Sequence, residues 1–495
     1  MDIIKTYRLA FMMLAALLLT SGAFAQEDEY KKWLKKEQEQ LQQFKDARDK
    51  EFTDFLKQQW KEFQSFKGIV PDDIPKPTKM PIFKRTKPEV RDSSTKKVEI
   101  KEIPQQRDQE EATKQPAPQP QPQPEEKKSQ FTIDLTFFGV PITLPHDIAT
   151  RPTLATPINE KSISDFWAAL SRMSYESLLA QAQNERVNRK LNDWGYILLL
   201  NRIGRSLFNN ARNEAVLFVW FMLSKSGFDT RLGYQGDFVH LLLPTPNMLY
   251  QVSYFELGGT NRYYAVQLDP SDQPFKGAIY TYGKKYPGAE KSADFCVKSA
   301  PYLKNQIKER TLKFTYGSKE YTLQTKVSRD AVDFFWEYPQ TNFEIYFSAT
   351  PSKEFMQSLL NQLTPLVEGK TEWDAVNMIL RFVQTAFEYK TDPDQFGREK
   401  PLFPDETVYY PFSDCEDRGI LFAYLVRTLL GLTVVGLDYP GHIATAVLFS
   451  TPVEGDSIIF QEKRFTICDP TYINADVGRC MPQFKGVKPE IIIIQ

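Results

Sequence analysis

The stretch that decides the fold is Ser413-Asp-Cys-Glu-Asp-Arg-Gly-Ile-Leu-Phe422. Ser413 and Glu416 have the spacing of a capping box, so a helix is predicted to begin here, and Gly431 is predicted to end it. Cys415 would then lie in the first helical turn, where unpaired backbone N–H groups favour the thiolate form of a cysteine. The three carboxylates beside Cys415 oppose that effect.

Two later segments carry the other polar groups that a thiol enzyme needs. His442 follows Tyr439-Pro-Gly441 and begins an alternating apolar run, which predicts a strand. Asp469 follows Arg464–Cys468, which predicts a second strand, although an Asp-Pro step is also a good turn after a strand. A Cys-His-Asp site needs an imidazole that takes the thiol proton and a carboxylate that orients the ring. The sequence therefore predicts a triad of Cys415, His442 and Asp469.

These segments resemble the transglutaminase-like superfamily, whose pattern is a helix-starting Cys, a His at a strand start and an Asp often followed by Pro. Asp414-Cys-Glu-Asp417 is most similar to the bacterial transglutaminase-like cysteine proteinases, periplasmic enzymes in which acidic residues beside the Cys help bind calcium. In that branch a Gly usually precedes the motif and a Tyr or Phe follows it, where this chain has Ser413 and Arg418. The resemblance covers roughly the last third of the chain.

The resemblance implies a protease or an acyl transferase that acts on amide bonds of protein or peptide substrates and requires no cofactor. It also implies a calcium ion held by Asp414 and Glu416. The alternative is that these acids only stabilise the first turn of the helix, where Glu416 has a capping role. The backbone N–H of Cys415 is expected to stabilise the oxyanion, and the nearby Tyr409 and Tyr410 are weak candidates for the second donor.

The expected fold class is α+β with a papain- or transglutaminase-like core in residues 350–495. There Cys415, at a helix N-terminus, packs on an antiparallel sheet that carries His442 and Asp469.

Short internal matches predict a duplicated module whose degenerate first copy occupies residues 131–349. Tyr234-Gln-Gly236 matches Tyr439-Pro-Gly441, and Asp269-Pro270 matches Asp469-Pro470. In this register Ala211 and Asp237 stand in the places of the thiol and the imidazole. The first copy would lack both catalytic groups and serve as a scaffold or a substrate-binding partner. Because Asp-Pro persists in that copy, it favours a turn as well as a catalytic role for Asp469.

Two segments between the copies carry strand patterns. Residues 312–327 predict a hairpin that turns at Gly317-Ser318, and residues 342–348 predict another strand.

Residues 1–25 have the pattern of a secretory signal. Lys5 and Arg8 precede the apolar run Leu9–Leu19, and Gly22-Ala-Phe-Ala25 has the small residues that signal peptidase prefers. Cleavage is predicted after Ala25, so we expect an exported protein of the periplasm or the extracellular space. No later apolar run approaches the roughly 20 residues of a membrane span, and no integral membrane span is expected.

The segment that follows the signal divides into a helix and a linker. Residues 26–68 are strongly charged and carry apolar residues at helical spacing, which predicts one or two amphipathic helices of coiled-coil type. Their apolar face would pack on the protein or on a second copy, or would bind an envelope partner. Residues 69–130 form a disordered Pro/Gln-rich linker, in which Pro116–Pro124 alternate with Gln and favour extended polyproline II.

Charge and cysteine content limit the other functions. With 62 basic and 63 acidic residues, nothing in the charge favours nucleic acid as a partner. Cys468 and Cys480 are close enough in sequence to form a disulfide, and pairing of Cys415 with Cys296 would abolish the proposed catalysis. The remaining alternative is a non-catalytic envelope scaffold or binding protein built on the same fold.

Overall fold

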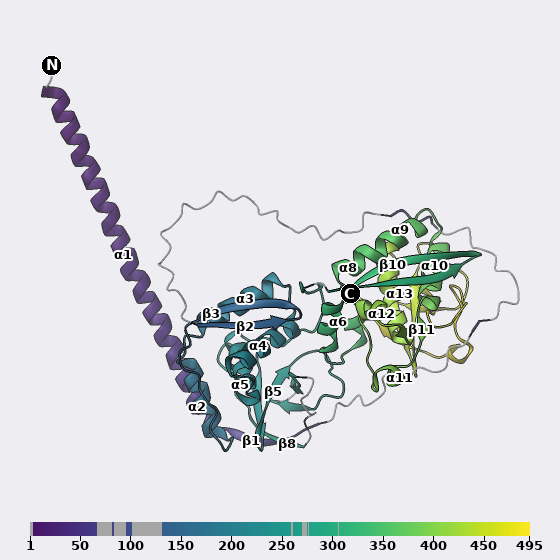
Figure 1. Cartoon of the computed structure of the whole chain (residues 1–495), viewed down its shortest axis with the longest axis horizontal. Helices are drawn as coiled ribbons and strands as arrows, with labels where there is room; N and C mark the ends of the chain where they lie inside the picture. The colour runs from purple at the N-terminus through teal and green to yellow at the C-terminus, as the bar shows by residue number, and fades with distance from the viewer. Residues whose placement is uncertain are drawn as a thin grey trace.

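The computed structural model describes residues 3–66, 82–83, 96–100, 131–258, 261–269, 275, 277–304 and 306–495, with side chains from residue 30 onward. The fold is α+β with antiparallel sheets, which confirms the predicted class. Figure 1 shows a long N-terminal helix that projects away from two globular units lying side by side.

The first globular unit contains four helices and a six-stranded antiparallel sheet. The sheet order is β1-β8-β4-β5-β7-β6, and β2 and β3 form a separate hairpin. Its elements are, in chain order, β1 (Trp60–Gln64), β2 (Phe131–Phe137), β3 (Val140–His146), α2 (Glu160–Ser171), α3 (Glu176–Asn188), α4 (Asp193–Leu207), α5 (Arg212–Lys225), β4 (Arg231–Gln235), β5 (Phe238–Pro244), β6 (Tyr254–Leu257), β7 (Asn261–Val266) and β8 (Ala278–Tyr282).

The second globular unit has a five-stranded sheet with order β15-β16-β14-β13-β17. Its elements are, in chain order, β9 (Ile307–Tyr316), β10 (Lys319–Ser328), α6 (Arg329–Trp336), α7 (Phe343–Phe347), α8 (Lys353–Phe355), η1 (Met356–Leu360), α9 (Asn361–Val367), α10 (Glu372–Thr385), β11 (Glu388–Tyr389), α11 (Asp392–Phe396), α12 (Pro404–Tyr409), β12 (Phe412–Ser413), α13 (Cys415–Leu430), β13 (Thr433–Tyr439), β14 (His442–Leu448), β15 (Ser457–Phe460), β16 (Lys463–Cys468), η2 (Pro482–Phe484) and β17 (Glu490–Ile492).

The two sheets follow one strand order. Five strands of the first sheet lie in the order β8-β4-β5-β7-β6, and the strands of the second lie in the order β17-β13-β14-β16-β15. When the five strands of each sheet are ranked by their place in the chain, both sheets have the order fifth, first, second, fourth, third. A largely buried helix precedes each set, α5 in the first unit and α13 in the second. Each unit also has an N-terminal hairpin that contacts an earlier helix. In the first unit β2 contacts α4, which directly precedes α5; in the second β9 contacts α10, which α11 and α12 separate from α13. Strand β1, which pairs with β8, is added to the first sheet alone.

The second unit includes more of the chain than the predicted range 350–495. The hairpin β9–β10 turns at Gly317-Ser318 as predicted, but it packs on α10, η1 and α12 of the second unit. Residues 342–348 were predicted as a strand and instead contain helix α7, with Ile345, Tyr346 and Phe347 all buried. A short apolar run fits either element, and here burial on several sides decided for the helix.

The N-terminal segment forms one continuous helix, α1 (Ile3–Leu56), and then strand β1. The predicted amphipathic segment 26–68 is therefore helical only as far as Leu56. Phe52 and Leu56 are buried in the first unit, where the Phe52 ring lies 4.9 Å from that of Trp167, so the end of the helix packs on its own protein. Apolar residues further from the first unit are exposed; they are Tyr30, Trp33, Leu34, Leu41 and Phe44.

Within the described part of the chain, no helix combines the length and the apolar character needed to cross a membrane. The predicted signal sequence and its cleavage after Ala25 concern residues whose side chains lie outside the described set, and they stay predictions.

The predicted linker 69–130 has two described points of contact with the second unit. The Phe83 N–H donates to the carbonyl of Ile473 at 2.8 Å, and the Val98 N–H donates to the carbonyl of Lys370 at 2.9 Å. At these points the prediction of disorder is wrong, because backbone groups find partners and Val98 is buried. The alternating stretch Pro116–Pro124 lies outside the described residues.

Candidate active site

Cys415 is the first residue of α13, as predicted, but the capping residues differ by one position. The N-cap is Asp414, whose backbone N–H donates to Asp417 Oδ2 at 3.2 Å. Ser413 is held in β12, which pairs with β11, and its hydroxyl accepts from the Arg418 side chain. The predicted cap formed by Ser413 and Glu416 is therefore wrong. The capping box is instead formed by Asp414 and Asp417, and the Glu416 carboxylate accepts from the Cys415 thiol.

The thiol lies against the strand that carries the predicted base. Cys415 is 0% exposed, and the backbone N–H of Ile443, the residue after His442, acts to lower the pKa of its thiol. The close approach of α13 to β14 depends on Gly419, because a Cβ there would meet Ile443 at 3.3 Å and Phe347 at 3.4 Å. The structure thus brings the nucleophile candidate to the start of β14.

His442 and Asp469 form the predicted pair. His442 Nε2 lies 2.9 Å from Asp469 Oδ2, and both side chains are buried. The imidazole also stacks on the Phe484 ring, with centroids 5.0 Å apart and planes 8° apart. Since the carboxylate accepts from Nε2, the imidazole nitrogen left to exchange a proton with a thiol is Nδ1.

Asp469 is fixed from two sides. Its Oδ1 accepts from the hydroxyl and the backbone N–H of Thr471, at 2.6 and 2.9 Å. Gln384 on α10 donates to the Asp469 carbonyl at 3.1 Å. Burial would raise the pKa of Asp469, but His442 and the Thr471 hydrogen bonds outweigh it, so that the pKa is lowered. The residue therefore orients the imidazole and also forms the turn that its Asp-Pro step predicted.

The electrostatic environment holds the proton on the thiol. Burial is the main cause that raises the pKa of Cys415, followed by the charges of Glu416 and Asp414. The thiol donates to Glu416 Oε2 at 3.0 Å, and only the Ile443 N–H works in the opposite direction. Burial and the neighbouring acids therefore outweigh the backbone N–H groups that favour the thiolate.

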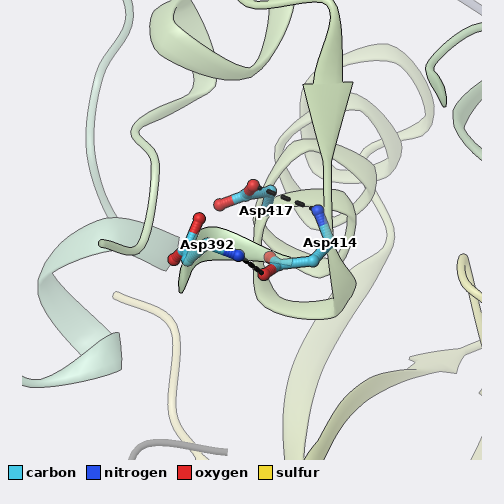
Figure 2. A group of neighbouring side chains, drawn as sticks. All are labelled: Asp392, Asp414 and Asp417. Carbon is cyan, nitrogen blue, oxygen red and sulfur yellow. Dashed lines mark hydrogen bonds between the residues drawn. The ribbon is translucent and has the colours of Figure 1, made fainter. Parts of the chain in front are cut away.

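A cluster of buried acids surrounds the start of α13 (Figure 2). Asp392, Asp414 and Asp417 place carboxylate oxygens within 4.8 Å of one another, and Asp392, Glu399 and Glu416 form an overlapping group. We call these five residues the acidic cluster. The Asp392 N–H donates to Asp414 Oδ2 at 3.2 Å, so the loop before the nucleophile is tied to the helix start.

Carboxylates packed this closely repel one another and resist ionisation. Burial first, then neighbouring acids, raises the pKa of Glu416 to about 8 and that of Asp392 to about 10. Burial raises the pKa of Asp417 to about 6. Among the described residues, Asp414 Oδ1 and Glu416 Oε1 are buried without a hydrogen-bond partner. Unsatisfied oxygen ligands of this kind fit a hard cation such as calcium.

The sequence pointed to Asp414 and Glu416 as calcium ligands but not to Asp392 or Glu399. The Asp and Glu residues of their loop carry no spacing signal that relates them to the nucleophile.

Tyr389 is a further residue that the sequence did not single out. It pairs with Ser413 across β11 and β12, two positions before the nucleophile. Burial is the first cause that raises the pKa of its hydroxyl, and the charge of Cys415 is the second, so the hydroxyl lies within electrostatic range of the thiol. The two weaker sequence candidates pack elsewhere: Lys308 lies over the Tyr409 ring, and Tyr410 packs on Phe396.

The corresponding places in the first unit hold no catalytic groups. Gln235 pairs with Phe238 across the β4–β5 turn as Tyr439 pairs with His442, so Phe238 takes the place of His442, and the predicted Asp237 is one residue out of register. By the same comparison, the pairing of β7 with β5 shows that Gln267, not Asp269, is the residue of the first unit that corresponds to Asp469. The repeated Asp-Pro step is thus no argument that Asp469 serves only a turn.

All four cysteines are free thiols, so Cys468 and Cys480 form no disulfide and Cys415 is not paired with Cys296.

Comparison with known proteins assigns this chain to no family. No family model, no curated protein and no solved structure matches it.

Proposed function

We propose that this chain is an exported thiol enzyme of transglutaminase-like type that acts on amide bonds of protein or peptide substrates. The observation that carries the proposal is the packing of α13 on β14, where Gly419 of the helix lies against Ile443 and the adjacent His442 is bonded to Asp469. A buried imidazole–carboxylate pair beside a thiol at a helix N-terminus is the arrangement that nucleophilic catalysis requires.

We also propose that the fold is a duplicated papain- or transglutaminase-like module whose first copy has lost its chemistry. The shared strand order of the two sheets supports a duplication, as does the equivalent hairpin in each unit. Phe238 and Gln267 stand in the places of His442 and Asp469 in the first copy, and Arg212, which begins α5 as Cys415 begins α13, stands in the place of the thiol one residue after the predicted Ala211. That copy would then serve as a scaffold or a binding surface for the second.

In the proposed reaction His442 Nδ1 takes the proton of the Cys415 thiol, and the sulfur attacks the amide carbonyl carbon. The tetrahedral intermediate collapses to a thioester when its C–N bond breaks, and the leaving amine takes the proton from Nδ1. Asp469 keeps the imidazole in the tautomer and orientation that this transfer needs. Water or a second amine then attacks the thioester, giving hydrolysis or transamidation.

Two donors are proposed for the oxyanion. One is the backbone N–H of Cys415, which has no intrahelical partner because it belongs to the first helical turn. The other is the Tyr389 hydroxyl, whose raised pKa keeps it protonated. Loss of one such donor typically costs about a hundredfold or more in rate.

Calcium fits the acidic cluster, and we propose that its carboxylates hold the ion at Asp392, which belongs both to the group with Asp414 and Asp417 and to the group with Glu399 and Glu416. The donor set consists only of carboxylate oxygens, and two of these oxygens are buried without partners among the described residues. When bound, the ion supplies positive charge beside the helix start. The residues themselves keep Glu416 next to the thiol and tie the loop to α13 through the Asp392 N–H.

A thiol-reactive peptide probe tests the enzyme proposal. The background variant is Cys296→Ser, because Cys296 is half-buried and a source of unspecific labelling. We expect labelling of this background, none after Cys415→Ala, and a rate at least a hundredfold lower after His442→Ala. Equal labelling with and without Cys415 would favour the alternative, a non-catalytic envelope scaffold.

Chelation tests the calcium proposal separately. Removal of divalent ions should lower the melting temperature, and calcium should restore it in the parent chain but not in Glu416→Gln. The control is Glu320→Gln, which removes an exposed acid of β10 and should respond as the parent does. A melting temperature that is indifferent to calcium in the parent chain would reject the site.

A further inference from the structure

A cavity of about 490 Å³ lies where the two units meet, separate from the proposed catalytic residues. Its walls come from α4, from the turn before β6, from the end of β7 and from the connection after α6. Arg398, from the loop that carries the acidic cluster, completes the lining. Its volume is within the usual range for small-ligand sites.

Two hydrogen-bond acceptors of the lining lack donors among the described residues. Gln340 is 7% exposed, and its Nε2 donates to the Glu399 carbonyl, which fixes the amide and leaves Oε1 without a partner. Glu337 is bonded to Arg202 through Oε1, while its Oε2 has no partner. Buried acceptors are almost always satisfied in folded proteins, so two in one cavity point to a ligand that brings N–H or O–H donors.

The rest of the lining narrows the class of ligand. Trp194 and Trp336 supply flat apolar surface, and Trp336 is 39% exposed. Arg398 lies over the Trp336 ring at 5.3 Å, whereas the charges of Glu337 and Asp269, the two acids of the lining, are compensated by Arg202 and Arg205. This balance favours a neutral or acidic ligand over a cationic one.

We propose that this cavity binds a short neutral or acidic segment of polypeptide. Backbone N–H groups of the segment donate to Gln340 and Glu337, an apolar side chain packs on Trp336, and a carbonyl or carboxylate accepts from Arg398. A peptide offers donors, acceptors and apolar groups at this close spacing, which matches the lining. That the bound polypeptide is also a substrate of the second unit rests on the proposed function; the binding itself does not.

The cavity is connected to the acidic cluster through one loop. Gln340 holds the carbonyl of Glu399, and the next residue, Lys400, donates its N–H to Asp392 at 2.6 Å. A segment bound at Gln340 and Arg398 therefore contacts the loop that helps to form the proposed calcium site. A substrate bound in the cavity, away from the thiol, would thereby be held beside the second unit.

The test uses the full chain with Cys415→Ala, so that no bound peptide is consumed. Neutral and acidic peptides are selected from a displayed library, and their affinities are measured by fluorescence anisotropy. We expect Gln340→Leu and Trp336→Ala each to weaken binding at least tenfold. The matched control is Trp33→Ala, which removes an exposed tryptophan of α1 and should leave affinity unchanged.

Three results would overturn the proposal. They are selection of no peptide, equal affinity in all three variants, and loss of binding in the control as well. Melting temperatures of the variants show whether weaker binding reflects unfolding. Because binding is measured without the nucleophile, peptide binding that persists when the thiol probe fails to label Cys415 rejects the enzyme proposal and leaves the binding site in place.

Discussion

At Cys415 several effects compete for one proton. The helix N-terminus and the Ile443 N–H favour the thiolate, while burial and the carboxylates of Glu416 and Asp414 favour the thiol. In the present arrangement the thiol form prevails. His442 and Asp469 are already in contact, so the residue that remains to be activated is the cysteine itself.

Asp469→Asn should reduce reactivity without unfolding the protein. The amide can still accept from Thr471 but cannot stabilise a charged imidazole, so we expect probe labelling of Cys415 to slow by about 10²- to 10⁴-fold. Circular dichroism should show an unchanged fold. Labelling at the parent rate would show that Asp469 serves the turn alone.

Tyr389→Phe separates oxyanion stabilisation from thiol activation. Loss of the hydroxyl should lower turnover of an amide substrate by about a hundredfold, while alkylation of Cys415, which forms no oxyanion, should change little. Tyr409→Phe is the control and should leave both rates unchanged. Equal loss in both assays would mean that Tyr389 acts on the thiol instead.

The raised pKa values of the acidic cluster predict how stability depends on pH. Glu416, with a pKa of about 8, and Asp417, with a pKa of about 6, hold protons more tightly when folded than when unfolded. Their contribution is present at acidic pH and is lost as pH rises through these values. In the presence of a chelator, the free energy of unfolding should fall by on the order of a few kcal/mol between pH 5 and pH 8. A rise over this range would contradict the prediction.

Calcium should oppose this decrease, because a bound cation lets the carboxylates stay ionised. The matched measurement is denaturant unfolding at pH 8 with and without added calcium.

Among the elements, the contact between α13 and β14 decides whether a site exists. The helix approaches the strand closely only because Gly419 has no side chain to displace Ile443 and Phe347. Its N-terminus is tied through Asp414 to the loop at Asp392, and the strand start is held by the Asp469 turn.

Gly419→Leu should displace the helix and abolish labelling of Cys415. Overpacking of this contact should cost about 1–3 kcal/mol of unfolding free energy. Gly283→Leu is the matched control, since a Cβ at Gly283 meets nothing within 4 Å and the residue has no positive φ. Normal labelling of a folded Gly419→Leu protein would argue against the close approach.

At the scale of the whole molecule, the N-terminal segment completes the first unit. The end of α1 carries Phe52 into a cluster of aromatic rings, and β1 then adds an outer strand to the first sheet. Asp49 forms a buried ion pair with Lys225 of α5. The part of α1 nearer its start projects away from both globular units, as Figure 1 shows.

Two phenylalanines of α1 test this arrangement by the same substitution. Phe52→Ala removes a ring that is 1% exposed and should cost about 3–5 kcal/mol of unfolding free energy. Phe44→Ala removes a ring that is 58% exposed and should change stability by less than about 0.5 kcal/mol. Similar losses in denaturant unfolding would mean that the projecting part of the helix is also packed.

Local sequence determined the elements and the order of the chemical groups. The helix from Cys415 to Gly431 and the strands at His442 and before Asp469 follow from apolar period and from glycine at a helix end, because these signals act within a few residues. The prediction of a strand at residues 342–348 was wrong because the apolar pattern of so short a run does not indicate on how many sides it will be buried.

Tertiary structure alone decided which distant groups meet. Asp392 and Glu399 join Glu416 only because a loop folds back on the start of α13, and Tyr389 lies beside Ser413, two residues before the nucleophile, only through the pairing of β11 with β12. The places equivalent to His442 and Asp469 in the first unit were fixed by strand register, which short sequence matches missed by one or two residues. Contact between residues far apart in the chain depends on packing and register, and a single sequence records neither directly.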